Sequence, residues 1–225
     1  MEWVRQLLEL KLIHQQQNLR WLINRFSSTA HFAKTALDRM DRSRTRLQQE
    51  NDYDVFRGIE GSASKWYWAA VALSLKKHTE FDGRVKRGPK DLFNKGLNYV
   101  YGITYGIIES SLLMCGLDPY IGFFHVIQYD KPTLAYDQIE PFRPWADRIL
   151  IQMFMQKMIT DEDVEEETGL LTSDCRKKII QYYYKVMHER SLLNGKKIKR
   201  IDHIHYLSQT LAQQIRNYDY KNDHL

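Results

Sequence analysis

Apolar side chains recur at helical spacing through most of the chain. In residues 1–26 they return every three or four positions around a face rich in glutamine, as expected for a helix with one side against a core. Similar spacing marks six further stretches: 30–40, 52–75, 91–115, 142–159, 173–193 and 201–218. No alternating run of β-branched residues is long enough to indicate a strand. The pattern predicts an all-α fold, with about seven helices in a single domain spanning residues 1–225.

Two interruptions of this pattern predict loops. Residues 76–90 contain two glycines and a proline between helical stretches, which is typical of an irregular connection. Asp91 follows and is suited to cap the next helix. Residues 116–119 combine a glycine with a proline-bearing turn, which ends that helix. We therefore expect His125 to lie on a loop or a short extended segment.

Composition is that of an ordinary globular protein. The 225 residues are 43% hydrophobic and 27% charged, which argues against disorder. Cys115 and Cys175 form no ligand-spaced pair, so a disulfide-free, cytosolic protein is expected. The most apolar segment, 97–117, is interrupted by Glu109 and neighbouring serines, which favours a buried helix over a membrane span. The first residues do not resemble a secretion signal.

The charge balance is compatible with a nucleic-acid partner. The formal net charge is +5 and the isoelectric point is about 9.0, although many basic proteins bind no nucleic acid. We expect phosphate contacts from cations in the loop at 84–90 and in a basic link at 196–200. The candidate side chains are Arg84, Lys86, Arg87, Lys90, Lys196, Lys197, Lys199 and Arg200.

Ligand-type side chains are concentrated between residues 57 and 144. Glu60 lies within an apolar helical stretch, His125 follows the tight turn, and Asp137 and Glu140 precede a proline-rich helix start. Carboxylate and imidazole groups bind Mg²⁺ or Mn²⁺, and magnesium sites commonly use one or two carboxylates. We predict one divalent-metal site, between helices and a loop, formed by Glu60, His125 and Glu140.

Each of these residues also has an ordinary structural interpretation. Taken singly, Glu60 could be a surface or capping glutamate, and His125 could be a core histidine bonded to a carbonyl. Asp137 and Glu140 have the spacing of a capping box, although Pro141 would remove the first regular backbone bond of such a helix. The spacing by itself leaves these interpretations open.

Five ordered blocks resemble the CRISPR-associated spacer-acquisition integrase, the first-numbered Cas protein. The first two are Glu60-Gly61 with Ala63 and Trp66-Tyr67-Trp68, then Phe81-x-Gly83-Arg84 with Pro89 and Asn94. The others are Asn98 to Tyr101, Gly116-Leu117-Asp118-Pro119 with Ile121-Gly122-Phe123 and His125, and Asp137-x-x-Glu140-Pro141-Phe142-Arg143-Pro144. Weaker similarity extends to both ends, so the whole chain is included.

This resemblance implies a chemistry and a set of partners. It assigns Glu60, His125 and Glu140 as metal ligands, with Asp137 as a supporting acid, and Mg²⁺ or Mn²⁺ as the cofactor. The family inserts prespacer DNA into the repeat array, where a 3′-hydroxyl attacks a phosphodiester at the edge of a CRISPR repeat. The same resemblance implies a cytoplasmic location in a prokaryote. It also implies two kinds of partner: DNA, as the prespacer fragment and as the CRISPR repeat and leader, and a small second adaptation protein.

One departure from the family pattern bears on assembly. Family members usually begin with a β-rich dimerisation domain, whereas Met1 here already lies in the first predicted helix. The usual assembly of two integrase dimers on a small partner is one expectation, and self-association of the helical domains into a dimer or tetramer is another. Two other functions stay open: a structure-selective metal-dependent nuclease that uses water, and a non-catalytic DNA-binding assembly subunit.

Overall fold

Eight α-helices and one small antiparallel sheet make up the described part of the chain. The structure is a computed structural model that describes residues 1–26, 29–126 and 129–218. The helices are α1 (Glu2–Arg25), α2 (Ala30–Gln49), α3 (Tyr53–Leu75), α4 (Leu92–Met114), α5 (Thr133–Gln138), α6 (Arg143–Met155), α7 (Ser173–Met187) and α8 (Arg200–Arg216). A short 3-10 helix, η2, covers Asp161–Asp163, and the strands are β1 (Arg190–Leu193) and β2 (Lys196–Lys199).

The predicted helical fold is confirmed. The side chain of Asp52 caps α3 by accepting hydrogen bonds from the backbone N–H groups of Asp54 and Val55, at 2.6 and 3.1 Å. Asp91 caps α4 in the same way, through the N–H of Asn94 at 2.8 Å. Such caps satisfy N–H groups that have no partner inside the helix. The loop at 76–90 lies between these two helices, as expected.

Three details differ from the sequence prediction. The helix expected over 173–193 ends at Met187, and the basic link is a strand that pairs with residues 190–193 in a hairpin. Asn194 and Gly195 have φ values of +48° and +78°, as expected for a two-residue turn that connects the strands of a β-hairpin. The helix expected over 142–159 ends at Met155, and α5 is an additional short helix. The last seven residues of the predicted domain, 219–225, lie outside the described residues.

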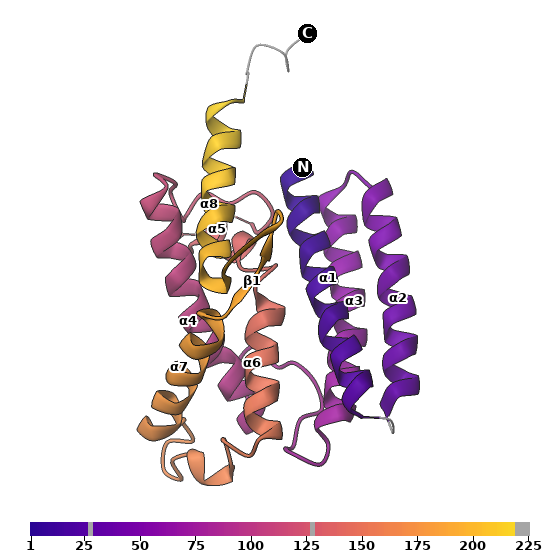
Figure 1. The fold of residues 1–225 in the computed structure, drawn as a ribbon, viewed down its shortest axis with the longest axis vertical. Helices are drawn as coiled ribbons and strands as arrows, with labels where there is room; N and C mark the ends of the chain where they lie inside the picture. The colour runs from indigo at the N-terminus through magenta and orange to yellow at the C-terminus, as the bar shows by residue number, and fades with distance from the viewer. Residues whose placement is uncertain (27–28, 127–128, 219–225) are drawn as a thin grey trace.

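The helices form two packed groups. Helices α1, α2 and α3 pack against one another on one side of the molecule, while α4 packs with α5, α6, α7 and α8 on the other (Figure 1). Contacts of α6 with α1 and α3, and of α5 with α1, join the groups. One continuous hydrophobic core runs through both. The junction between the groups brings α1, α3 and the α5–α6 segment together.

Among the described residues, none of the helices combines the length and the apolar character that a membrane span requires.

Candidate active site

Two carboxylates from distant parts of the chain meet at one lysine. Lys11 of α1 donates hydrogen bonds from Nζ to Glu60 of α3 and to Glu140 Oε2, the latter at 2.5 Å. Lys11 is 5% exposed and lies in the buried stripe of α1, next to Leu8 and Leu12. A buried ammonium group requires compensating charge, and here two carboxylates supply it. The packing of α1 against α3 and α6 therefore brings Glu60 and Glu140 together.

A second cation holds Glu140. Arg143, one turn further along, donates from Nε to Glu140 Oε1 at 2.9 Å and from a terminal nitrogen to the hydroxyl of Tyr105 at 2.5 Å. Burial alone would raise the pKa of Glu140, but Arg143 and Lys11 reverse the effect and hold it far below its ordinary value. Glu140 is thus an ionised carboxylate with both oxygens occupied by cationic donors.

Glu60 and Lys11, the other two residues of this cluster, are also charged. Burial raises the pKa of Glu60, but the attraction of Lys11 outweighs it, and the net shift is downward. Burial lowers the pKa of Lys11, while Glu140 and Glu60 raise it above its ordinary value. Together with Arg143, the cluster contains two positive and two negative charges that compensate one another in a poorly hydrated site.

His125 is oriented by Asp137. The imidazole Nδ1 and the Asp137 carboxylate are 2.6 Å apart, and the backbone N–H of His125 donates to the same oxygen at 2.9 Å. The other oxygen of Asp137 accepts from the N–H groups of Phe123 and Phe124, at 2.6 and 3.0 Å. A buried carboxylate on α5 therefore fixes the loop that carries the histidine. This arrangement leaves Nε2 without a hydrogen bond in the described structure and places the Nδ1 proton toward the carboxylate.

Gly122 lets the loop approach α5 closely. A Cβ at this position would lie 2.7 Å from the backbone carbon of Thr133 and 2.9 Å from the Asp137 carboxylate. The N–H of Gly122 also donates to the hydroxyl of Thr133 at 3.0 Å. Any larger side chain would push the loop away from α5, because backbone atoms cannot yield as a side chain can. The glycine is thus a requirement for the Asp137 contacts.

The structure gathers the predicted ligands only in part. Glu60 and Glu140 share Lys11, and His125 is close enough to Glu140 to lower its pKa, but His125 itself bonds to Asp137. Within residues 1–26, 29–126 and 129–218, no three acidic, histidine or cysteine side chains are arranged to hold a metal. The ammonium of Lys11 instead lies between the two carboxylates.

The residues nevertheless fit a divalent cation. The Lys11 ammonium shows that the two carboxylates converge on a positive charge, and His125 offers an unbonded Nε2. A histidine whose other nitrogen is held by a carboxylate is the usual arrangement of a metal-binding imidazole. Two carboxylates and one imidazole suit Mg²⁺ or Mn²⁺. The three-ligand metal site stays a prediction.

A buried acid lies behind this cluster. Asp147 of α6 accepts hydrogen bonds from the hydroxyls of Tyr101 and Tyr67, at 2.5 and 3.1 Å. Burial raises its pKa to about 7, even though both hydroxyls and the charge of Arg143 act in the opposite direction. Tyr101 also lies under the guanidinium of Arg143, 4.8 Å from the ring centre. Asp147 is thus connected to the ion cluster through Tyr101 and Arg143.

The basic residues predicted to contact DNA occupy two surfaces. In the loop before α4, Lys86, Arg87 and Lys90 are exposed. Arg84 is half-buried, with terminal nitrogens 3.0 and 2.6 Å from the side-chain oxygens of Asn94 and Asn98. Arg84 therefore holds the loop against α4 in addition to carrying charge.

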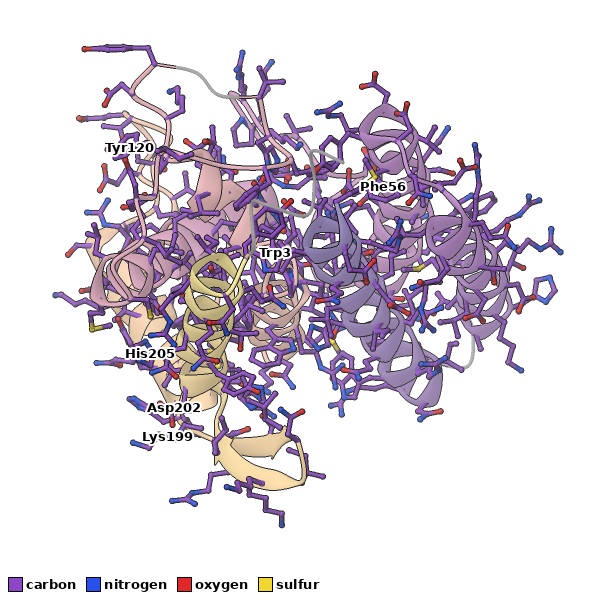
Figure 2. All side chains as sticks on the ribbon, turned by 90° about the horizontal axis from the view of Figure 1, so that it is seen from above. Trp3, Phe56, Tyr120, Lys199, Asp202 and His205 are labelled. Carbon is purple, nitrogen blue, oxygen red and sulfur yellow. The ribbon has the colours of Figure 1, made fainter. Side chains whose placement is uncertain are left out.

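The second basic surface is the hairpin. Lys196, Lys197 and Lys199 are exposed on β2, and the hairpin that carries the labelled Lys199 lies at the edge of the molecule in Figure 2. Arg200 differs, because it donates to the carboxylate of Glu189 at 2.6 Å and to the carbonyl of Val186 at 3.0 Å. It closes the base of the hairpin.

Sequence reasoning missed Lys11 and the role of Arg143. The available signal for Lys11 is its place among the apolar positions Leu7, Leu8 and Leu12 of the first helix, because core positions rarely hold an unpaired charge. Arg143 belongs to the proline-rich block, and its spacing of three residues from Glu140 is the available signal for their ion pair.

Solved structures share this helical fold. A casposase bound to integration product has a TM-score of 0.82 and 21% identity, with 100% of this chain and 67% of that chain covered. A Cas6-RT-Cas1–Cas2 complex has a TM-score of 0.79 and 20% identity, with 96% of this chain and 24% of that chain covered. The fold thus defines the class: a helical domain common to Cas1 proteins and a casposase.

Sequence comparison gives the family. The model for CRISPR associated protein Cas1 matches residues 1–185, and the chain belongs to the Cas1 family. An endonuclease Cas1 of Hyperthermus butylicus is 32% identical over 219 residues, with 92% of this chain and 63% of the relative covered. One from Thermus thermophilus is 31% identical over 156 residues, with 68% of this chain and 47% of the relative covered. The chain spans between about two fifths and two thirds of the lengths of the first relatives it matches.

Proposed function

We propose that this chain is the catalytic domain of a metal-dependent DNA integrase that inserts short DNA fragments into a CRISPR repeat array. The observation that carries the proposal is the convergence of Glu60 and Glu140 on one buried positive charge. Membership in the Cas1 family and the exposed basic surfaces agree with it. The reaction is a transesterification, in which a 3′-hydroxyl attacks a phosphodiester and a new 3′-hydroxyl leaves.

Glu60, His125 and Glu140 would hold the cation. A bound Mg²⁺ or Mn²⁺ would neutralise charge on the attacked phosphate and favour ionisation of the attacking hydroxyl. Ser64 donates its hydroxyl to Glu60 at 2.8 Å and so helps to hold this carboxylate, and the proposed reaction requires no covalent bond to a side chain.

The chain's own residues prepare the site for this cation. Arg143 keeps Glu140 ionised and, 4.8 Å above the ring of Tyr101, is itself fixed in place. Asp137 holds the Nδ1 proton of His125, so that Nε2 presents a lone pair. The exposed lysines of the loop and of the hairpin would hold the DNA backbone, because each neutralises a phosphate and releases counterions.

The proposed partners are DNA and a small second adaptation protein. Support comes from two solved structures with the same fold, a casposase bound to integration product and a Cas6-RT-Cas1–Cas2 complex. Full integration joins two strand ends at a fixed separation, so we propose that two or more copies of the domain act together.

Strand transfer tests the proposal. Fragments with 3′-hydroxyl ends are incubated with a supercoiled plasmid carrying a repeat array, in Mg²⁺ or Mn²⁺, and joined products are separated from nicked ones. We expect joined product from the wild type and at least a 100-fold loss in Glu60→Gln and Glu140→Gln. Exposed Glu167→Gln is the matched control and should retain activity.

The products of this assay also distinguish the integrase from a nuclease and from a non-catalytic assembly subunit. Nicked plasmid without joined product would assign water as the nucleophile and make the protein a nuclease. DNA binding that persists in His125→Ala and Glu140→Gln, with no metal-dependent product from the wild type, would assign a non-catalytic assembly role.

A further inference from the structure

Tyr101 of α4 is a buried tyrosine that interacts with two arginines. The guanidinium carbon of Arg143 lies 4.8 Å from the centre of its ring, and that of Arg84 lies 5.4 Å from the same centre. Tyr101 is only 5% exposed. The electrons of an aromatic ring attract a nearby cation, more strongly where water is scarce. One ring thus attracts two cations from separate segments of the chain.

The two arginines have different partners beyond this ring. Arg143 donates from Nε to Glu140 at 2.9 Å, and Glu140 is a proposed metal ligand. Arg84 belongs to the loop before α4, and its terminal nitrogens donate to the side chains of Asn94 and Asn98 at 3.0 and 2.6 Å. Tyr101 therefore interacts with one cation that is bound to a proposed ligand and with another that anchors the basic loop.

The two guanidinium groups also influence each other directly. Burial lowers the pKa of Arg84, and the positive charge of Arg143 acts in the same direction. Because like charges repel one another, a shift of either arginine changes the force on the other.

The hydroxyl of Tyr101 is held by a buried carboxylate. It donates to Asp147 Oδ1 at 2.5 Å, and the hydroxyl of Tyr67 donates to Oδ2 at 3.1 Å. The ring of Tyr67 packs edge-on against Trp68, at 4.9 Å between ring centres. The two tyrosines therefore share one acceptor but serve different neighbours, and Tyr67 provides a matched comparison for the hydroxyl of Tyr101.

A second tyrosine supports Arg143. Tyr105 accepts a hydrogen bond from its guanidinium at 2.5 Å, and the ring centre of Tyr105 lies 5.5 Å from the guanidinium carbon. Tyr105 thus helps to fix Arg143 on Glu140. Tyr101 differs in its additional interaction with Arg84, which links the loop to the same guanidinium.

We propose that Tyr101 is a positioning residue that couples the loop before α4 to the metal ligand Glu140. Its ring holds Arg143 against Glu140 and holds Arg84 at the start of the loop, so that displacement of Arg84 alters the position of Arg143. Packed side chains transmit such changes between neighbouring groups. The inference rests on the proposed function, since it takes Glu140 as a metal ligand, but the position of Arg143 can be measured without metal.

Hydrogen exchange at the Nε–H of Arg143 tests the positioning step. It is measured by NMR on the full, metal-free chain. In Tyr101→Leu, which removes the ring, we expect exchange to accelerate by at least about 10-fold. Tyr101→Phe retains the ring and should restore most of the protection. Tyr67→Phe, which removes the other hydroxyl bound to Asp147, should change exchange by less than about twofold.

Tyr183→Leu is the control for the loss of a large buried side chain. Tyr183 of α7 is 1% exposed, and its hydroxyl lies 3.0 Å from that of Thr104 on α4. Equal acceleration at Arg143 in Tyr183→Leu and Tyr101→Leu would overturn the proposal, because general destabilisation would then explain both. Exchange in Tyr101→Leu that matches the wild type would overturn it as well.

Manganese affinity tests the coupling to the loop. Arg84→Met is compared with Lys86→Met, which removes the same charge from an exposed position in the same loop. Loss of a nearby positive charge by itself favours Mn²⁺, so lost positioning has the opposite sign. We expect Arg84→Met to lower Mn²⁺ affinity by about 3- to 10-fold and Lys86→Met to leave it unchanged or slightly higher.

The same titration separates this inference from the proposed function. Mn²⁺ affinity in Arg84→Met equal to or above that in Lys86→Met would overturn the coupling. A wild-type protein that binds no Mn²⁺ would contradict the proposed function, and the exchange of Arg143 would then decide the positioning role by itself. Because Arg84 is half-buried at the surface, its replacement tests the coupling even if the Tyr101→Leu protein fails to fold.

Discussion

At the scale of single residues, the central feature is the buried ammonium of Lys11 between Glu60 and Glu140. Removing one member of a buried ion cluster costs more than the cluster contributes, because the remaining charges lose compensation. The two carboxylates would then repel each other in a largely buried site. Lys11 was recognisable in the sequence only as a charge at a core position, since its partners lie 49 and 129 residues away along the chain.

Replacement of Lys11 by methionine tests this arrangement. The methionine retains the apolar stem of the side chain and removes the charge. We expect the free energy of unfolding to fall by about 3–5 kcal/mol, measured by urea denaturation without metal. Added Mn²⁺ should raise the melting temperature of Lys11→Met more than that of the wild type, because no ammonium competes for the carboxylates. Lys34→Met, exposed on α2, should match the wild type in both measurements.

The raised pKa of Asp147 predicts that the free energy of unfolding depends on pH. Its pKa is about 7 in the folded protein, against 3.8 ordinarily, because it is buried. A group with a raised folded pKa contributes stability below its unfolded pKa and loses that contribution as pH rises through the folded value. Relative to Asp147→Asn, the wild type should lose up to roughly 4 kcal/mol between about pH 4 and pH 7. A pH-independent difference between the two proteins in urea denaturation would contradict this assignment.

At the scale of elements, the helices were predictable and the hairpin was not. The cap Asp91 lies where the sequence placed it, because a carboxylate before an amphipathic stretch acts locally. In the hairpin, Leu192 and Leu193 continue the apolar spacing of α7, so the sequence pattern predicts a helix where the structure has a strand and a turn. Asn194-Gly195 was the available signal, as this dipeptide favours positive φ in two-residue turns. The position of His125 depended on Asp137 in α5, a contact that no local pattern specifies.

The contact of α5 with the histidine loop gives a prediction for Asp137→Asn. Three backbone N–H groups and the imidazole share the Asp137 carboxylate. An amide cannot accept all of these bonds, so the amides of Phe123, Phe124 and His125 should exchange hydrogen at least 10-fold faster. The change should also lower metal affinity by roughly 10- to 100-fold. Asp174→Asn on the surface of α7 is the control, and unchanged exchange in the loop would contradict the positioning role.

The hairpin gives a second prediction at this scale. Its three exposed lysines, Lys196, Lys197 and Lys199, should contact duplex phosphates. Changing all three to glutamine should lower the log-log salt slope of duplex binding by roughly 2.7, without loss of thermal stability. The same change at Lys34, Lys76 and Lys77, which are also exposed, removes equal charge from other elements. A similar reduction in slope in both triple variants would show that only net charge matters.

At the scale of the whole molecule, the site is a product of tertiary packing. The first helix supplies Lys11, the third supplies Glu60, and the α5–α6 segment supplies Asp137, Glu140 and Arg143. None of these elements forms a site alone, and the hydrophobic core that joins the two groups of helices brings them together. The blocks that resemble the integrase family identified most of the participants, whereas the ion pairs among them required the three-dimensional structure.

The most direct test of the account is the position of Mn²⁺ in crystals of this chain, determined from its anomalous scattering. We predict a single strong peak bonded to carboxylate oxygens of Glu60 and Glu140 and to Nε2 of His125, with Lys11 Nζ displaced from its position between the carboxylates. A peak bonded elsewhere, or no peak while Lys11 stays bound to both glutamates at saturating Mn²⁺, would contradict a metal-dependent active site at this junction.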